Sequence, residues 1–106
     1  MIARNVTMHL KANSVAEFTR TLEKEVLPLL RRQKGFQDEI TFSAPGAKET
    51  VAISFWDTQE NADAYSRGSY QEVLKTLAKV LVGTPQVQTW EVANSTVHKI
   101  AAAGAA

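Results

Sequence analysis

The chain has 106 residues, and twelve lysines and arginines nearly balance eleven aspartates and glutamates, which leaves a formal net charge of +1. This length suits one domain with a modest core, and the near-neutral charge argues against a nucleic-acid or membrane partner recruited by bulk electrostatics. The sequence has no cysteine and two histidines, His9 and His98. Disulfides and thiol chemistry are therefore excluded, and a multi-histidine metal site is not expected. No segment has the pattern of a signal peptide or a membrane span, so we expect a cytoplasmic protein.

The first predicted element is a strand over residues 2–10, in which apolar and polar side chains alternate. Val6, Met8 and Leu10 share one face. The other face carries Ala3, Asn5, Thr7 and His9. Polar side chains on one strand face can line a cavity, so the last three are candidate site residues.

Apolar residues recur every three or four positions over residues 14–34, which predicts an amphipathic helix. Ser14 and Glu17 fit a capping box at its start, and Gly35 suits the left-handed conformation at its end. Pro28 lies inside this helix, so we expect a kink or one interrupted hydrogen bond there.

A hairpin of two strands follows, over residues 36–42 and 49–56. In the first of these strands, alternation predicts one face made of Phe36, Ile40 and Phe42. The second strand is apolar on both faces, which is typical of a central strand.

Capping signals also introduce two later helices. The signal at residues 57–60 predicts a short helix to Arg67, and Ser69 and Glu72 fit a capping box before a helix to Leu81. Residues 86–93 form the last predicted strand.

The element order is βαββαβ, an α+β arrangement of the ferredoxin-like type with a four-stranded antiparallel sheet. We expect a single domain over residues 1–96 and a flexible C-terminal tail over residues 97–106. Two helices can cover only one face of such a sheet, and the other face still carries apolar side chains. We therefore expect a homodimer that forms through that sheet face.

Three features of the sequence resemble the antibiotic biosynthesis monooxygenase family of the dimeric α+β barrel superfamily. They are the polar-striped first strand with its capped helix, the run Lys34-Gly35-Phe36, and the segment from Ile53 to Ala62. The resemblance covers residues 2–93. It implies a cavity between the sheet and its helices. Members use this cavity to oxidise polycyclic phenols with O₂ and no cofactor, or to bind and degrade heme.

The resemblance also implies functional positions. Asn5 and Tyr65 match positions that carry function in relatives, and Lys75 lies near the place of the axial histidine in the heme-binding members. This chain has no histidine from residue 10 to residue 97. Because heme iron would need a neutral imidazole there, heme binding is the less favoured alternative, and we predict neither a cofactor nor a metal.

The predicted catalytic residues are Asn5, Tyr65 and His9. Asn5 would donate a hydrogen bond to a substrate oxyanion or to reduced oxygen, and His9 would act as a general base near neutral pH. Asn5 equally suits a solvated strand end, and for His9 a surface position at the rim of the strand is the favoured alternative. The residues predicted to hold a flat aromatic substrate are Trp56, Tyr70, Thr7 and Trp90, although the aromatic ones also suit core packing.

These observations favour a cofactor-independent monooxygenase that oxidises a phenolic or quinol-like aromatic molecule with O₂. The alternative is a non-catalytic dimeric module of the same fold that binds a small ligand or only assembles. A cavity filled by Trp56, Tyr65 and Trp90 would favour the module.

Overall fold

The computed structural model describes residues 1–44, 46 and 48–100. The order of its elements confirms the predicted βαββαβ arrangement. None of the helices within these ranges is long and apolar enough to cross a membrane. In chain order the elements are β1 (Ile2–His9), α1 (Val15–Thr21), the π-helical segment η1 (Leu22–Val26), α2 (Leu27–Arg31), β2 (Phe36–Ser43), β3 (Glu49–Trp56), α3 (Gln59–Arg67), α4 (Tyr70–Leu77), the 3₁₀ segment η2 (Ala78–Val80) and β4 (Gln86–Glu91).

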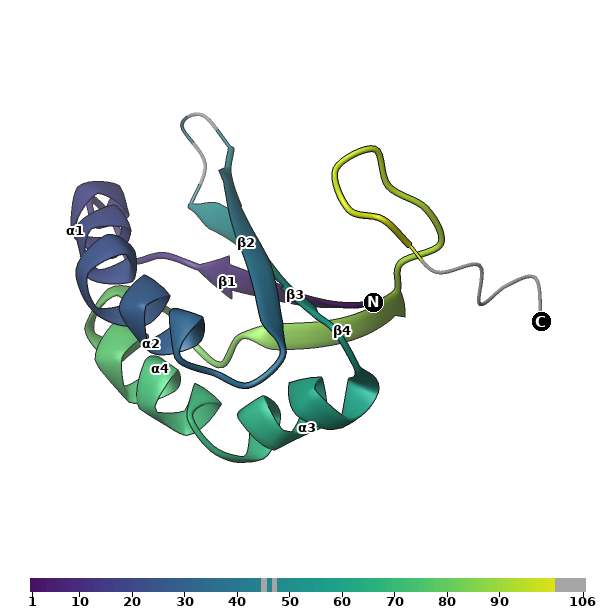
Figure 1. The fold of residues 1–106 in the computed structure, drawn as a ribbon. Helices are drawn as coiled ribbons and strands as arrows, with labels where there is room; N and C mark the ends of the chain where they lie inside the picture. The colour runs from purple at the N-terminus through teal and green to yellow at the C-terminus, as the bar shows by residue number, and fades with distance from the viewer. Residues whose placement is uncertain (45, 47, 101–106) are drawn as a thin grey trace.

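The four strands form one sheet in the order β2-β3-β1-β4, and every neighbouring pair is antiparallel. β3 lies between β2 and β1, which confirms its predicted central position. Figure 1 shows the helices gathered on one side of this sheet. The opposite side, called the open face below, is not covered by any helix of the described chain.

The core fills the layer between the sheet and the helices. Its largest fully buried side chains include Trp56 of β3 and Phe18 of α1. On β1, the apolar side chains of Val6 and Met8 point into this layer and are buried. The helices therefore cover the predicted apolar face of β1.

The strand register defines the open face. Asn5, for example, pairs with Ile53 of β3 and Gln88 of β4, so these three side chains point the same way. The open face is apolar over β2 and β3 and more polar over β1 and β4. It consists of Asp38, Ile40, Phe42, Val51, Ile53, Phe55, Ala3, Asn5, Thr7, Gln86, Gln88 and Trp90.

A β-bulge changes the faces of β2. The register of β2 on β3 shifts between Phe36 and Asp38, so Phe36 packs against buried Trp56 whereas Ile40 lies on the open face. The predicted common face of Phe36 with Ile40 and Phe42 is therefore wrong, because a bulge adds one residue to the strand and reverses the alternation beyond it.

The predicted first helix forms as α1, η1 and α2 in succession, and it ends at Arg31. The N–H of Leu27 donates to the carbonyl of Leu22, five residues back. Pro28 has no N–H, and its ring crowds the carbonyl four residues earlier, so a wider π turn directly before Pro28 relieves the conflict. The local disturbance predicted at Pro28 is confirmed.

Only one of the three predicted caps forms as a hydrogen bond. Oγ1 of Thr58, within the signal at residues 57–60, accepts from the N–H of Asn61 at 3.2 Å. The hydroxyls of Ser14 and Ser69 cap nothing. The backbone explains the difference, because an N-cap needs an extended conformation. Thr58 has one, whereas Ser69 is already helical.

The end of the described chain folds back to the sheet. Val92 N–H donates to the carbonyl of Met1 at 2.9 Å, and the ring of His98 lies 5.9 Å from that of Phe55. Nε2 of His98 lies 3.3 Å from Oδ2 of Asp38, without hydrogen-bond geometry. The predicted tail from residue 97 thus includes a contact with the open face, and its residues 101–106 lie outside the described residues.

Candidate functional site

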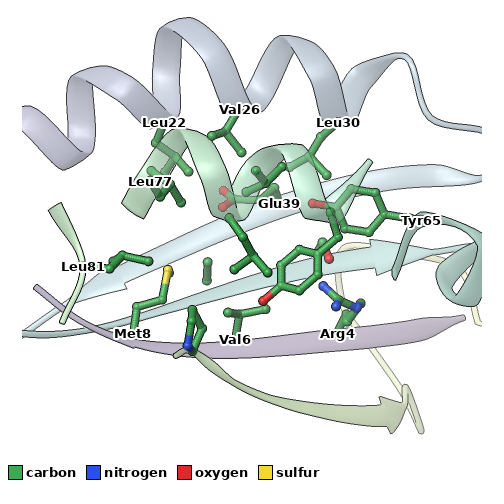
Figure 2. Close-up of a pocket in the computed structure, with 16 residues that line it drawn as sticks. Arg4, Val6, Met8, Leu22, Val26, Leu30, Glu39, Tyr65, Leu77 and Leu81 are labelled. Carbon is green, nitrogen blue, oxygen red and sulfur yellow. The ribbon is translucent and has the colours of Figure 1, made fainter. Parts of the chain in front are cut away.

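A narrow cavity lies between the sheet and the helices (Figure 2). Its volume is about 40 Å³, which is room for roughly two or three water molecules. Leu22 and Val26 of η1 and Leu30 of α2 reach it across the π turn. The lining consists of Arg4, Val6, Met8, Leu22, Val26, Leu30, Glu39, Ala52, Ser54, Tyr65, Tyr70, Val73, Leu74, Leu77, Leu81 and Pro85.

The two ends of this cavity differ in chemistry. Figure 2 shows Arg4 and Tyr65 at one end, and Met8 and Leu81 at the other. Met8 at the aliphatic end is unbranched, and a methionine side chain can change rotamer around a guest. A small aromatic ring could therefore enter with side-chain movement while a polar substituent remains near Arg4.

Arg4 is the centre of the polar end and is only 4% exposed. Its Nε donates a hydrogen bond to Oγ of Ser66 on α3 at 2.7 Å. The guanidinium lies 4.1 Å from the ring centre of Tyr70 and 5.3 Å from that of Tyr65, which is the range of cation–π contacts. Three side chains from two helices thus hold one buried cation.

Tyr65 and Tyr70 present hydroxyls that stay protonated near neutral pH. Burial raises the pKa of both tyrosines, and the neighbouring Arg4 guanidinium opposes part of the rise. The two side chains line the cavity and are 5% and 9% exposed. Both hydroxyls can therefore donate hydrogen bonds to an oxygen atom placed beside them.

Glu39 of β2 brings a carboxyl group to the cavity wall (Figure 2). Its Oε2 accepts a hydrogen bond from Oγ1 of Thr41 at 2.6 Å. Partial burial raises the pKa of Glu39, the Thr41 hydroxyl opposes this rise, and the nearby Asp38 adds to it. Glu39 therefore takes up a proton at a higher pH than a solvated glutamate does.

Trp56 packs against Tyr65 at the polar end and is not part of the cavity lining. Its ring is fully buried and stacks on Tyr65 with the centroids 4.8 Å apart. Nε1 donates to Oγ of Ser54 at 2.9 Å, and Phe36 packs against it edge-on at 5.7 Å. Trp56 therefore fixes the Tyr65 ring in place. Trp56 is outside the lining, so it would affect a substrate only through Tyr65 and not by the predicted direct contact.

The polar stripe of β1 does not face the cavity. Asn5, Thr7 and His9 alternate with residues that line it, so they project from the other side of the sheet. This stripe therefore does not line the cavity between sheet and helices, because the helices pack on the apolar side of β1. Nε2 of His9 lies 4.0 Å from the carboxylate of Glu49, with both side chains exposed. Oδ1 of Asn5 is buried and has no hydrogen-bond partner among the described residues.

Trp90 also lies away from the cavity. It pairs with Ala3 across β4 and β1, and 56% of its surface is exposed. The predicted cavity contact of Trp90 is therefore not found. Of the predicted site residues, the structure brings Tyr65 and Tyr70 together at the cavity.

The sequence-based predictions do not include Arg4 or Glu39. Arg4 alternates together with Val6 and Met8. A charged residue on the apolar face of a strand was therefore the sequence signal that could have identified it. For Glu39 the available signal was weaker, because the bulge after Phe36 obscures which face of β2 meets the helices.

The described residues do not fit heme or a clustered metal site. No three histidine, cysteine or acidic side chains within them lie close enough to hold a metal ion. The cavity lining contains no histidine, and Lys75, near the position of the axial ligand in the resemblance, is exposed. Heme iron would therefore find no imidazole here.

Known proteins resemble this chain in structure and not in sequence. No family model matches it, and no curated protein matches it. A protein assigned to the antibiotic biosynthesis monooxygenases from Bordetella bronchiseptica superposes with a TM-score of 0.74, over 88% of this chain and 97% of its own, at 19% identity. SnoaB, a cofactor-independent oxygenase from Streptomyces nogalater, gives 0.72 over 92% and 97%, at 13% identity. The chain has the fold of the antibiotic biosynthesis monooxygenases.

This likeness confirms the predicted ferredoxin-like α+β class and the resemblance to the antibiotic biosynthesis monooxygenases at the level of the fold. A protein of unknown function from Nitrosomonas europaea, NE2512, shares it with a TM-score of 0.76 over 92% of this chain and 94% of its own, at 17% identity. Likenesses at this level of identity establish the antibiotic biosynthesis monooxygenase fold. The activity has to be argued from the cavity, since one fold hosts several functions.

Proposed function

We propose that this protein is a cofactor-independent monooxygenase that acts on a phenolic or quinol-like aromatic molecule. One observation carries the proposal: an apolar cavity ends at Tyr65, Tyr70 and Arg4. An apolar pocket with a few convergent polar groups is the usual form of a small-molecule site. The fold shared with SnoaB, which is itself a cofactor-independent oxygenase, supports the choice of reaction.

In the proposed reaction the substrate supplies all the electrons, so the protein has to bind, desolvate and orient it. The phenolic hydroxyl loses its proton, and the electron-rich ring then reacts with O₂. One oxygen atom enters a ring carbon and gives a quinone, and the other leaves as water. Oxidation of the phenol to the quinone balances the reduction of O₂.

Two tyrosines and one tryptophan have roles in this proposal. The hydroxyls of Tyr65 and Tyr70 hold the substrate oxygen, and both are protonated donors near neutral pH because burial raises their pKa. Trp56 acts as a positioning residue, since its ring stacks on Tyr65. Preorganised donors of this kind act most strongly in a site that excludes water.

Oxygen uptake by metal-stripped protein tests this proposal, with a panel of naphthols and hydroquinones as substrates. We expect uptake that saturates with substrate, resists chelators and falls about tenfold or more in Tyr65→Phe. Glu72→Gln, an exposed change on α4 outside the cavity lining, serves as the control with unchanged uptake. Uptake no faster than without protein, over the whole panel, contradicts the proposal.

Asn5→Ala tests the competing assignment of the site to the open face. Because Asn5 projects away from the cavity, its loss should leave uptake within about twofold of the wild type. Loss of uptake in Asn5→Ala together with full uptake in Tyr65→Phe would move the site to the open face.

We also propose that two copies of the chain pair through their open faces. Ile40, Phe42 and Trp90 are 44%, 55% and 56% exposed there, and contiguous apolar surface of this kind usually marks an interface. A two-fold axis brings the same patch of both copies together, so one contact covers both open faces.

The small cavity volume favours a second candidate, a module that binds a ligand without catalysis. About 40 Å³ is far below the ~300–1,000 Å³ typical of pockets for larger ligands. Saturable binding of a panel phenol without oxygen uptake would support this candidate. Turnover of any panel member would oppose it.

A further inference from the structure

Arg4 is a buried cation whose charge is not balanced by an anion of the described chain. It is 4% exposed, and none of the ion pairs among the described residues includes it. Burial of a charge is costly unless hydrogen bonds or an opposite charge replace the lost water. Ser66 and the two tyrosine rings supply part of that replacement.

The two terminal nitrogens of Arg4 carry four N–H donors, and those that the Tyr70 hydroxyl does not accept from are available to a guest. The hydrogen bond to Ser66 uses Nε, and neither terminal nitrogen is among the buried polar atoms that lack a partner. The space that Arg4 lines is the cavity, so its remaining donors are next to any guest that enters there. A guanidinium held at Nε and stacked on a ring presents its remaining donors in a fixed plane.

Glu39 does not serve as the missing partner. It shares the cavity with Arg4, yet it forms no ion pair with Arg4, and its carboxylate accepts from Thr41 instead. Burial raises the pKa of Glu39, whereas an adjacent guanidinium would lower it. The positive charge at the polar end is therefore still free to attract an anion from outside.

We propose that Arg4 binds an anionic oxygen of the substrate, so that the cavity selects an apolar ring bearing a phenolate or carboxylate oxygen. The inference rests on the proposed function, in that the bound anion is the molecule to be oxidised. Arg4 supplies the charge, and Tyr65 and Tyr70 supply neutral donors beside it. Leu22, Leu77 and the other aliphatic side chains meet the ring. Pairing with Arg4 also lowers the cost of removing the phenolic proton, because it stabilises the anion that results.

Three small aromatic probes of matched size test this selection on the full chain. 4-Nitrophenol has a phenolate whose visible absorbance differs from that of the phenol, 4-nitrobenzoate is an anion at neutral pH, and 4-nitroanisole is a neutral isostere. We expect the phenolate and the benzoate to bind about tenfold or more tightly than the anisole. The pKa of bound 4-nitrophenol should fall by about one unit or more, which corresponds to the same tenfold preference for the anion. The visible absorbance of the phenolate reports this pKa directly.

Variants assign the effect to Arg4. Arg4→Gln should abolish the preference for anions and return the pKa of bound 4-nitrophenol to its value in water. Arg67→Gln removes an exposed arginine that directly follows Ser66 on α3 and should change nothing. Glu39→Gln repeats the titration without the carboxyl group of the lining.

A fourth variant keeps the test valid if Arg4→Gln does not fold. Ser66→Ala retains the guanidinium and removes its hydrogen bond to Oγ. It should weaken phenolate binding several-fold with little effect on the anisole. Circular dichroism of each variant establishes that it is folded before binding is measured.

The possible outcomes separate this inference from the proposed function. Binding of either anion that depends on Arg4 supports the inference even when no oxygen is consumed, and benzoate binding alone identifies the anion as a carboxylate. The inference is overturned when the anisole binds as tightly as the anions, when Arg4→Gln changes nothing, or when wild-type protein binds none of the probes. Oxygen uptake in the same preparation would then still stand as a separate result.

Discussion

Gly35 is the residue whose backbone the turn before β2 depends on most. Its φ is +82°, and a Cβ at this position would collide with the side chains of Asp57 and Asn61. Those side chains are themselves joined, since Asn61 Nδ2 donates to Asp57 Oδ1 at 2.8 Å. The predicted left-handed glycine is thus confirmed, and the structure adds a close approach, so that any side chain here would have to displace Asp57 and Asn61.

Gly35→Ala should therefore destabilise the protein by about 3 kcal/mol, of which the left-handed backbone accounts for about 1–2 kcal/mol. Gly83→Ala is the matched control, because Gly83 has φ +71° and no neighbouring atom near a Cβ. Gly83→Ala should destabilise the protein by only about 1–2 kcal/mol, the part that the left-handed backbone accounts for. Urea unfolding measures both, and equal losses for the two variants would contradict the role given to the collision.

Glu39 should make the stability of the protein depend on pH. Burial raises the pKa of Glu39 above its ordinary value of 4.5, so the folded chain holds this proton more tightly than the unfolded chain. The stability from protonation is then full below about pH 4.5 and is lost as the pH rises through the raised pKa. Glu39→Gln cannot lose a proton, so its melting temperature relative to wild type should rise between pH 4 and pH 7.

The control for this pH dependence is Glu91→Gln, since Glu91 is an exposed glutamate at the end of β4. Its melting temperature relative to wild type should not vary over the same pH range. A constant difference for Glu39→Gln as well would mean that the carboxyl titrates equally in the folded and unfolded chains.

At the scale of whole elements, the three capping signals provide a direct comparison. Thr58→Ala removes the bond to the N–H of Asn61 and should destabilise the protein by about 1 kcal/mol. Ser14→Ala and Ser69→Ala remove hydroxyls that do not cap α1 or α4, so they should cost a few tenths of that. Thermal unfolding of the three variants checks this, and three similar losses would show that the serines cap in solution.

Periodicity was sufficient to predict the order and type of the elements, but not which strand face meets the helices. A strand with alternating side chains has two faces, and the helices pack on the face where more apolar surface is buried. Arg4 lies on the same face as Val6 and Met8, because side chains two residues apart in a strand point the same way whatever their polarity. Asn5 follows the opposite parity, which is why the predicted catalytic stripe and the cavity lie on different sides of β1.

Two local irregularities also lay beyond the sequence pattern. The bulge after Phe36 has no glycine to signal it, and it decides that Glu39 faces the cavity. The π turn of η1 follows from the position of Pro28, but whether the helix breaks, kinks or widens depends on packing against the sheet. Both irregularities place side chains in the candidate site, as expected where local rules give way to function.

At the scale of the molecule, the candidate site exists only because separate elements meet. Arg4 comes from β1, Ser66 and Tyr65 from α3, Tyr70 from the start of α4 and Glu39 from β2. No short motif joins them, so a search of the sequence for contiguous signatures has nothing to find. The topology supplies the connection, since β1 pairs with β3, which leads directly into α3.

The open face gives a prediction for the assembly of the molecule. The C-terminal segment contacts the end of this face at Asp38 and Phe55 through His98, which leaves Ile40 and Phe42 uncovered. A lysine at position 42 would place one charge of each copy in a two-fold contact and would also lose apolar area. Phe42 is 55% exposed in the single chain, so this change should leave the fold intact.

Sedimentation velocity at micromolar concentration should therefore give a dimer for the wild type and a monomer for Phe42→Lys. Val15→Lys is the matched control, because Val15 is 45% exposed on α1, on the helical side of the molecule. It should remain a dimer. A monomeric wild type would mean that the open face stays in contact with water. A dimer that survives Phe42→Lys but not Val15→Lys would place the contact on the helices, and the apolar side chains over β2 and β3 would then need another partner.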